Sequence, residues 1–389
     1  MKRVIIIVLD SLGIGALPDA ADYGDEGADT LLHILEAVLG MMIPNLLSLG
    51  LGNIKGAAGG RLAVKRPQAA YARLAEASKG KDTITGHWEI AGLFTSEPFR
   101  TFERFPDSFM SDFEKRIGVA TLGNYPASGT VIIEELGFEH ENTGKPIVYT
   151  SADSVFQIAA NTDVIPLEQL YSMCAAAREM LTGSLSVGRV IARPYIVKDG
   201  KRVRTSERRD YAVSPPRPTM LDYIKGAGKT VCGIGKISDI FNGKGITESI
   251  HTDGNSDGVA KTAECMKRDF SGLIFTNLVD FDSKFGHRRD CAGYAGALEE
   301  FDAALPGIIS AMREDDMLIL CADHGNDPAH SGWDHTREAV PAIVFGKGVK
   351  AVDLGARESF ADIGATVMEA LVIEGDLRGS SFFQLIYKG

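Results

Sequence analysis

The sequence predicts an α/β protein, built as a core sheet with helices on both faces and a smaller α+β domain inserted into it. Continuous apolar runs, such as residues 4–9 and 317–322, are typical of strands that are buried on both faces. Helical patterns alternate with such runs towards both ends of the chain. Between residues 96 and 218 this alternation stops, which indicates a second domain.

Length and charge limit the classes of function. The 389 residues are enough for more than one hydrophobic core. The chain has 41 Lys and Arg and 52 Asp and Glu, a net charge of −11. We therefore expect no general basic surface that would bind nucleic acid or an anionic membrane. An anionic substrate would therefore need local cationic side chains.

The cysteines and the amino terminus indicate the compartment. Five scattered cysteines without a C-x-x-C pair are typical of free thiols in a reducing compartment. The start of the chain resembles a signal peptide, but Asp10 ends its apolar run after six residues, which is too early. No other run is long enough to cross a bilayer. We therefore expect a cytoplasmic protein.

The first hundred residues begin with a buried strand at residues 4–9. Asp10 opens the loop after it, where a lone Asp most often only caps a turn. Residues 22–37 offer Asp29 or Thr30 as the N-cap of a helix, and residues 44–51 are typical of a second, short helix. Both helices are expected to cover the sheet.

Residues 79–93 lead from a polar, glycine-containing loop into a helix that we expect to start near Gly86, with Thr85 at or next to the N-cap. A hydroxyl there lies beside free amides and the positive end of the helix dipole, which suit an attached phosphate. Capping threonines are far commoner than nucleophilic ones, so the local pattern leaves both roles of Thr85 open.

The inserted segment differs from the rest of the chain in its residue composition and in its pattern of predicted elements. Five phenylalanines lie between residues 99 and 113, followed by a turn-rich stretch at 123–129 and a helical pattern at 166–181. Two strand-like runs, 187–196 and 202–212, are joined around Asp199-Gly200, which is a hairpin signal. With the proline-rich residues 214–218 as a hinge, we expect a core of residues 1–95 and 219–389 and an inserted domain of residues 96–218.

After the hinge the alternating pattern returns. It predicts helices at 219–226, 258–268, 294–312 and 362–371, and strands at 229–234, 272–279, 317–322 and 340–345. Asp280 and Asp282 follow the second of these strands, with His287 five residues beyond Asp282. Asp323 and His324 follow the third.

Acidic side chains thus follow three strands, and such side chains converge only if the strands are neighbours in one sheet. Four of the eight histidines lie nearby: His287, His324, His330 and His335. Carboxylates and imidazoles without thiolates favour manganese, zinc or iron over a structural zinc site. Two ions roughly 3.5–4 Å apart could clamp the attacking and leaving oxygens of a phosphoryl displacement.

Four stretches carry a family resemblance: residues 81–89, 277–282, 285–290 and 322–328. Together with Asp10 and His335 they resemble the phosphopentomutase family of the alkaline phosphatase superfamily. The similarity covers essentially the whole chain, and no motif position departs from it. The resemblance implies an alkaline-phosphatase-like core sheet, which binds metal, and an inserted cap domain that contacts the substrate.

The resemblance also implies site residues. Two Mn²⁺ ions per chain would be bound by two groups of side chains: Asp282, His287 and His335, and Asp10, Asp323 and His324. Thr85 would be the phosphorylated nucleophile between them, and His330 an ordinary loop histidine. The implied substrate contacts are Asp153, Val155, Arg189, Ile191 and Lys236. Each could instead be an ordinary strand or turn residue.

The implied reaction interconverts ribose 1-phosphate and ribose 5-phosphate, and the 2-deoxyribose pair, through a phosphothreonine and a sugar bisphosphate. A sugar bisphosphate such as glucose 1,6-bisphosphate would be the activator, and a cap would exclude water. The alternatives are another superfamily member, such as a cofactor-independent phosphoglycerate mutase or a phosphomonoesterase, or a metal-binding module without activity. The last would lack a ligand or a hydroxyl, and none is missing.

Overall fold

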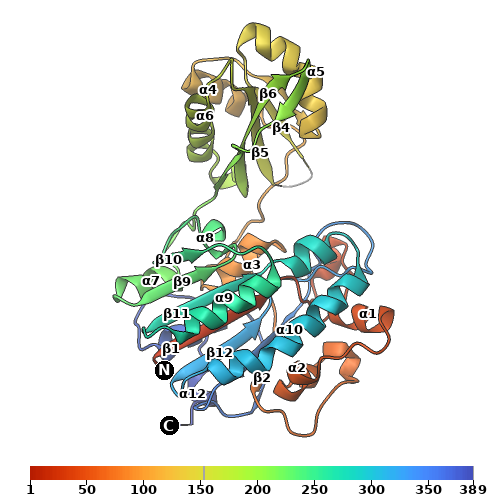
Figure 1. Cartoon of the computed structure of the whole chain (residues 1–389), viewed down its shortest axis with the longest axis vertical. Coiled ribbons are helices and arrows are strands. Elements are labelled where there is room, and N and C mark those ends of the chain that lie inside the picture. The colour runs from red at the N-terminus through yellow and green to blue at the C-terminus, as the bar shows by residue number, and fades with distance from the viewer. Residues whose placement is uncertain (152–153, 389) are drawn as a thin grey trace. The chain divides into compact units, whose positions relative to one another are not determined.

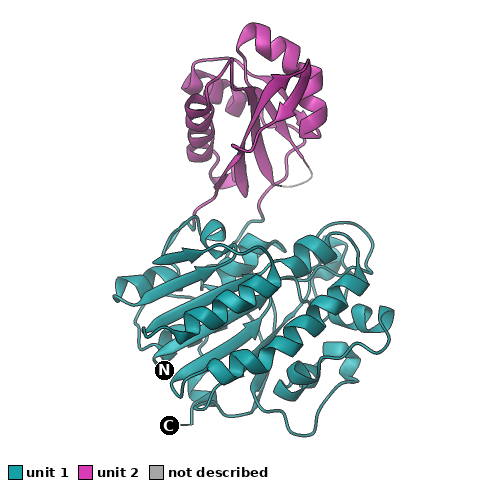
Figure 2. Ribbon diagram, viewed as in Figure 1, with its two compact units in different colours: residues 1–98, 215–389 teal, residues 99–214 magenta. Residues whose placement is uncertain are grey.

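The computed structural model describes residues 1–151 and 154–388. They form two compact units: unit 1 comprises Met1–Pro98 and Pro215–Gly389, and unit 2 comprises Phe99–Ser214 (Figure 2). Unit 2 is therefore inserted between the two segments of unit 1. The roles expected for them, a catalytic core and a cap, stay predictions.

Unit 1 contains an eight-stranded sheet. All strands run in one direction except β13, which is antiparallel to both of its neighbours. Their spatial order is β10 (Glu248–Ile250), β9 (Thr230–Ile234), β11 (Gly272–Leu278), β1 (Arg3–Leu9), β12 (Asp316–Cys321), β13 (Val340–Phe345), β2 (Ala70–Leu74) and β14 (Asp353–Arg357). The strands predicted from continuous apolar runs, β1, β9, β11, β12 and β13, are all present.

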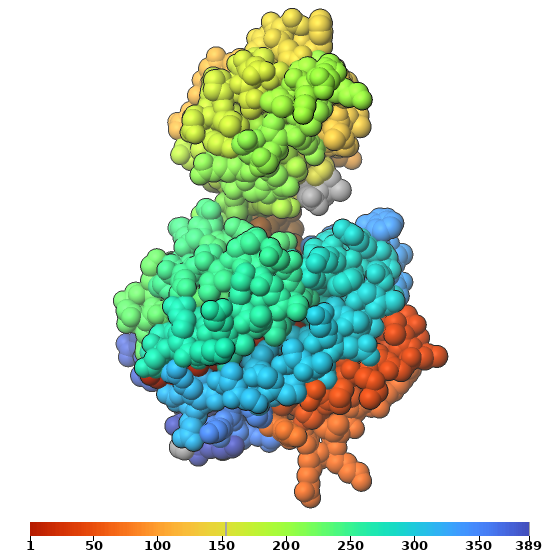
Figure 3. All heavy atoms as spheres, in the orientation of Figure 1, coloured from red at the N-terminus to blue at the C-terminus, as the bar shows by residue number. Residues whose placement is uncertain are grey.

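Every residue of β1, β11 and β12 is buried, so both faces of this sheet are covered. In one group, α10 (Cys291–Ala311) contacts each of three helices, α1 (Thr30–Ala37), α2 (Pro44–Leu49) and α9 (Asn255–Lys267) (Figure 1). A second group comprises α3 (Thr83–Ile90), α7 (Met220–Gly226), α8 (Ile237–Ile240), α11 (Ala361–Ala370) and α12 (Phe383–Ile386). The space-filling view shows α9 and α10 spread over the face turned to the viewer (Figure 3). The predicted α/β class is confirmed.

The centre of the sheet places three strand ends side by side. β1 lies between β11 and β12, and Val8 is paired in register with both Asn277 and Cys321. Because the three strands are parallel and end level with one another, the residues after them meet at one edge of the sheet. This is the arrangement that convergence of the acidic side chains required.

Unit 2 has a mixed six-stranded sheet. Its order is β3 (Leu122–Pro126), β4 (Ile147–Thr150), β5 (Val155–Asn161), β6 (Arg189–Lys198) and β7 (Lys201–Arg204), and β8 (Arg209–Ala212) also pairs with β6. The predicted hairpin is present between β6 and β7. Asp199 and Gly200 both have positive φ, 53° and 73°, as a tight hairpin turn requires.

Two predictions for unit 2 were wrong in detail. The run at 202–212 is not one strand but two, β7 and β8, which pair with different parts of β6. The stretch at 123–129 contains much of strand β3, although it was expected to be turn-rich. Gly123 and Asn124 within β3 have positive φ, 86° and 71°, so the residues that signalled a turn form an irregular strand instead.

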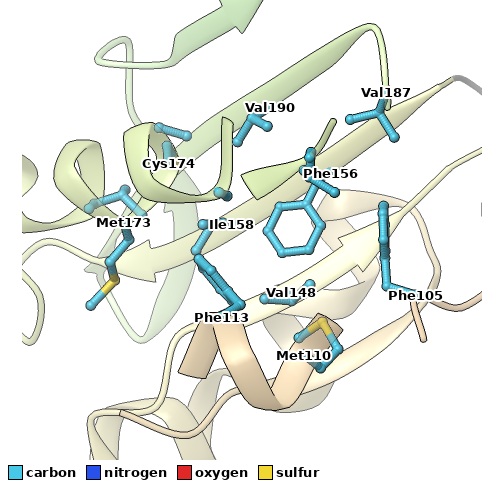
Figure 4. Packing of buried hydrophobic residues seen from close by; sticks show 14 of the residues in the cluster. Phe105, Met110, Phe113, Val148, Phe156, Ile158, Met173, Cys174, Val187 and Val190 are labelled. Carbon is cyan, nitrogen blue, oxygen red and sulfur yellow. The ribbon is translucent and has the colours of Figure 1, made fainter. Parts of the chain in front are cut away.

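The crowded phenylalanines form one core of unit 2 (Figure 4). Phe105, Phe109 and Phe113 surround Phe156, with ring centroids 4.9, 5.7 and 5.3 Å away and nearly perpendicular planes. Such edge-to-face contacts add to the stabilisation from burial. Helices α4 (Asp107–Ile117) and α6 (Leu167–Met180) cover this face of the sheet, while α5 (Gly129–Thr143) packs on the alternate side chains, those of the other face.

No helix in the described part of the chain combines the length and the apolar character that a membrane span needs.

Replacing Phe156 by Ala should lower the free energy of unfolding by about 3–5 kcal/mol, because the change removes a fully buried ring from among three others. Urea unfolding followed by circular dichroism would measure the loss. Phe138→Ala is the control, since that ring is 73% exposed. Comparable losses for the two variants would contradict the role given to Phe156.

Candidate metal centre and active site

The edge of the sheet next to β1, β11 and β12 gathers the predicted ligands. Two groups of three side chains can each place one donor atom within 4.8 Å of the others: Asp10, Asp323 and His324, and Asp282, His324 and His335. Because His324 belongs to both groups, the two groups adjoin. The arrangement can therefore accommodate two neighbouring cations.

The sixth predicted ligand, His287, lies beside the second group. Its Nε2 is 3.3 Å from Asp282 Oδ2, and its ring centroid is 4.7 Å from that of His335. His330 belongs to neither group and lies near the backbone oxygens of Ser331 and Glu26. The structure thus brings the six predicted ligands together and leaves His330 outside.

The centre has atoms that fit a cation. Asp10 Oδ1, Asp323 Oδ2 and His335 Nε2 are buried, and none has a hydrogen-bond partner among the described residues. Imidazole nitrogens are the nearest groups: His87 Nδ1 is 3.0 Å from Asp323 Oδ2, and His324 Nε2 is 3.5 Å from Asp10 Oδ1. Buried carboxylates are costly unless positive charge is close to them, so a cation bound here would stabilise them. Carboxylates and imidazoles together suit manganese, zinc or iron.

The charges of the centre support this fit. Burial raises the pKa of Asp10 well above its usual range, and Asp323 and Asp282 raise it further. Burial alone would lower the pKa of His324, but the carboxylates of Asp323 and Asp10 raise it to about 9. The carboxylates around His324 thus favour its protonated form. Metal binding would release this proton.

Hydrogen bonds orient the carboxylates, and their donors were not among the residues predicted for the site. Asn277 Nδ2 donates to Asp10 Oδ2 at 2.7 Å, and Asn326 Nδ2 donates to Asp282 Oδ1 at 2.7 Å. The amide of Ser11 donates to Asp323 Oδ1 at 3.1 Å. Groups of this kind fix the direction in which a ligand oxygen points. Both asparagines lie in the stretches that resemble the family, which was the only signal for them.

Arg289 connects the loop that carries His335 to the turn that carries Asp282 and His287. Its guanidinium donates to Asn326 Oδ1 at 2.6 Å and to the backbone oxygens of Asp327, Gly332 and Asp334 at 2.9, 2.7 and 3.1 Å. Its φ of 56° is unusual for a residue other than glycine. The turn includes a short π-helix, Phe281–Gly286, and such turns are frequent at functional sites.

The position expected for helix α3 was wrong. The helix begins at Thr83, and its N-cap is Asp82, whose Oδ1 accepts from the amides of Ile84 and Thr85. Thr85 lies inside the first turn and is fully buried, and its hydroxyl donates to Asp82 Oδ2 at 2.6 Å. Asp and Thr both favour the N-cap, and the sequence pattern assigned the cap to the later of the two.

Thr83 occupies the place expected of Thr85. It is the first residue of α3 and only half-buried, and its Oγ1 lies 3.2 Å from Nε2 of His324, the residue shared by both donor groups. Gly86 allows the helix to come this close, since a Cβ there would lie 2.0 Å from the carbonyl oxygen of Asp323. The hydroxyl nearest the candidate centre in α3 is therefore that of Thr83.

The predicted substrate contacts are divided between the units. In unit 2, Val155 is paired in register with Arg189, so both side chains, with that of Ile191, lie on one face of the sheet. An Arg189 nitrogen is 3.7 Å from the Asp210 carboxylate. Lys236 is exposed in the turn after β9 of unit 1, as expected. Asp153 lies outside the described residues.

Comparison with known proteins gives consistent results. A model of the metalloenzyme superfamily matches residues 2–375. A phosphopentomutase of Acetivibrio thermocellus is 56% identical over 384 residues, which cover 98% of this chain and 99% of the relative. A phosphopentomutase of Clostridium kluyveri is 55% identical over 390 residues, the whole of both chains. The solved phosphoglycerate mutase of Leishmania mexicana shares the fold, with a TM-score of 0.50 at 13% identity over 99% of this chain and 98% of that one.

The fold, the donor groups and the family model define a member of the metalloenzyme superfamily. Within that superfamily the chain belongs to the phosphopentomutase family. It is therefore an enzyme of the isomerase class. The resemblance seen in the sequence is confirmed.

Replacing Arg289 by Ala should weaken the binding of divalent metal by about 10- to 100-fold, because the change removes the hydrogen bonds that link the His335 loop to the Asp282 turn. Calorimetric titration of the metal-stripped protein with Mn²⁺ would measure this. Arg288→Ala removes the same charge from an exposed neighbour and should bind as the wild type does. Unchanged affinity in the Arg289 variant would remove its positioning role.

Proposed function

We propose that this enzyme interconverts ribose 1-phosphate and ribose 5-phosphate, and the 2-deoxyribose pair, through a phosphothreonine at the start of α3. The observation that carries the proposal is the hydroxyl of Thr83 beside His324, at the junction of the two donor groups. The choice of substrates follows from relatives named phosphopentomutase that match the chain over its full length.

Asp282, His287 and His335 would hold one Mn²⁺ ion, and Asp10, Asp323 and His324 the other. When bound, the two ions would supply positive charge beside the attacking and leaving oxygens and would lower the pKa of a nearby hydroxyl. Asn277 and Asn326 would keep two of the carboxylates in position.

The start of α3 is suited to a phosphorylated side chain. Thr83 is at the first helical position, where the positive end of the helix dipole favours an anion. Asp82 uses one carboxylate oxygen to cap the helix and the other to accept from Thr85. We therefore propose Thr83 as the nucleophile and a structural role for Thr85, the nucleophile expected from the sequence.

The proposed cycle needs only the sugar phosphate and the phosphorylated enzyme. A hydroxyl of the sugar phosphate attacks the phosphorus of phosphothreonine, so that the new phosphorus–oxygen bond forms as the bond to Thr83 Oγ1 breaks. The proton of the sugar hydroxyl ends on the threonine oxygen, and the product is a sugar bisphosphate. Transfer of its other phosphoryl group to the threonine gives the isomer. A sugar bisphosphate such as glucose 1,6-bisphosphate would phosphorylate the enzyme initially.

Val155, Arg189 and Ile191 in unit 2 and Lys236 in unit 1 remain proposed substrate contacts. Arg189 carries a planar guanidinium that can donate two hydrogen bonds to a phosphate, whereas Lys236 offers a point charge. A protein of net charge −11 needs such local cations for an anionic substrate. The alternative of a phosphoglycerate mutase has only the shared fold in its favour.

The nucleophile can be identified by intact-mass and peptide mass spectrometry after incubation with glucose 1,6-bisphosphate. The wild type should gain one phosphoryl group, and Thr83→Ala should gain none and lose mutase activity by about a thousandfold or more. Thr85→Val should still be phosphorylated, because its hydroxyl is buried against Asp82. Phosphate on Thr85 in the wild type would restore the assignment made from the sequence.

Metal removal provides a separate test. Exhaustive chelation should abolish mutase activity, and added Mn²⁺ should restore it. His335→Ala should weaken Mn²⁺ binding and activity strongly, whereas His330→Ala should change both little, because His330 lies outside the donor groups. Full activity in the chelated enzyme would contradict the proposed centre.

A further inference from the structure

The start of helix α5 in unit 2 has the features of an anion site. The helix is 15 residues long, and its N-cap, Ser128, makes no side-chain capping hydrogen bond. The first amides of such a helix lack partners within the helix and lie at the positive end of its dipole. A helix start alone does not make a binding site, so the side chains around it determine whether an anion can bind there.

Two polar side chains converge on the first residue of α5, Gly129. A Cβ built on Gly129 would lie 1.7 Å from Arg204 Nη2 and 2.3 Å from the hydroxyl oxygen of Tyr149. A larger residue at this position would therefore displace at least one of these groups. The guanidinium of a β7 residue and the hydroxyl of a β4 residue thus meet at the positive end of the helix.

Both groups have unused hydrogen-bonding capacity. Tyr149 is 1% exposed, yet its hydroxyl has no hydrogen-bond partner among the residues that the structure describes, and neither does Arg204 Nε. The Arg204 guanidinium lies beside the Tyr149 hydroxyl and opposes the rise in its pKa, but no acceptor for the phenol proton lies among the described residues. A buried polar group without a partner is unfavourable, so a ligand that supplies acceptors would stabilise this part of unit 2.

The surrounding charge is positive. The guanidinium groups of Arg193, Arg204 and Arg208 all act on the Tyr149 hydroxyl, against the effect of burial, which raises its pKa. Arg208 is paired with Asp210 at 2.6 Å. Arg193 Nε donates at 3.1 Å to the neutral side chain of Gln157, the residue that pairs in register with Tyr149.

The neighbouring acids do not neutralise this charge. Glu134 and Glu141, both on α5, lie within 3.4 and 2.8 Å of Arg202, and Glu141 also accepts from Tyr195. In the described part of unit 2, Arg193 and Arg204 form no ion pair. Two guanidinium groups therefore remain in excess in a protein whose net charge is −11.

We propose that the first turn of α5, Tyr149, Arg193 and Arg204 form a binding site for a phosphate dianion or phosphate monoester within unit 2. Guanidinium forks and free helix amides both match phosphate oxygens, and the Tyr149 hydroxyl adds a donor. The site is inferred from unit 2 alone. That its natural ligand is a pentose phosphate or a sugar bisphosphate rests on the proposed function.

The test uses the full-length protein stripped of metal, titrated calorimetrically with inorganic phosphate, ribose 5-phosphate and ribose. Phosphate and ribose 5-phosphate should bind at one site, and ribose should not. Tighter binding of ribose 5-phosphate would identify a sugar phosphate as the ligand, and equal affinities would identify free phosphate. Arg204→Gln should weaken binding at least tenfold, and Arg204→Lys should recover part of the loss, because the ammonium lacks the fork.

Arg209→Gln is the matched control. It removes the same charge from β8, but the Arg209 guanidinium lies over the rings of Tyr171 and Tyr211, 5.3 and 5.1 Å from their centroids, which pack against the other core of unit 2. This variant should bind phosphate as the wild type does. Equal weakening by Arg204→Gln and Arg209→Gln, or no saturable binding by the wild type, would overturn the proposal.

The result is separable from that of the proposed reaction. Thr83→Ala removes the proposed nucleophile in unit 1 and should leave phosphate binding by the metal-stripped protein unchanged. Loss of phosphate binding in Thr83→Ala would mean that the titration reports unit 1 and would overturn the unit 2 site. Intact binding in an enzyme without mutase activity would support the site and contradict only the proposed function.

Discussion

The burial of several carboxylates at one edge of the central sheet is the constraint on which the rest of unit 1 depends. Asp10, Asp282 and Asp323 are almost wholly removed from water and lie near one another because β11, β1 and β12 are adjacent and parallel. Such an arrangement is unfavourable unless positive charge is nearby. His287 and His324, whose pKa values are raised by neighbouring carboxylates, and in the proposed function two cations, supply that charge.

The groups around these carboxylates serve to hold them in place. The sheet sets only where each strand ends, and the side-chain directions are set by hydrogen bonds from Asn277, Asn326 and the amide of Ser11. Arg289 then joins the two loops that carry the remaining ligands. A metal centre of this kind needs such outer contacts, because flexible carboxylates alone would not keep a fixed geometry.

The two units differ in local charge in a way that suits a phosphate-transferring enzyme. Unit 1 gathers acidic side chains that can hold cations, and unit 2 has guanidinium groups in excess beside the start of α5. Each unit also has its own core, since the phenylalanine cluster around Phe156 lies wholly within unit 2. The net charge of −11 sums over both units, so by itself it indicates neither site.

The sequence by itself determined the α/β class, the buried strands β1, β11 and β12, and the acids and histidines after them, because apolar runs and strand-end residues are local patterns. The tertiary structure alone decided that Thr83 reaches His324 and that Tyr149 and Arg204 meet at Gly129. These contacts join segments up to 241 residues apart. They depend on the register and packing of whole elements, which no local pattern records.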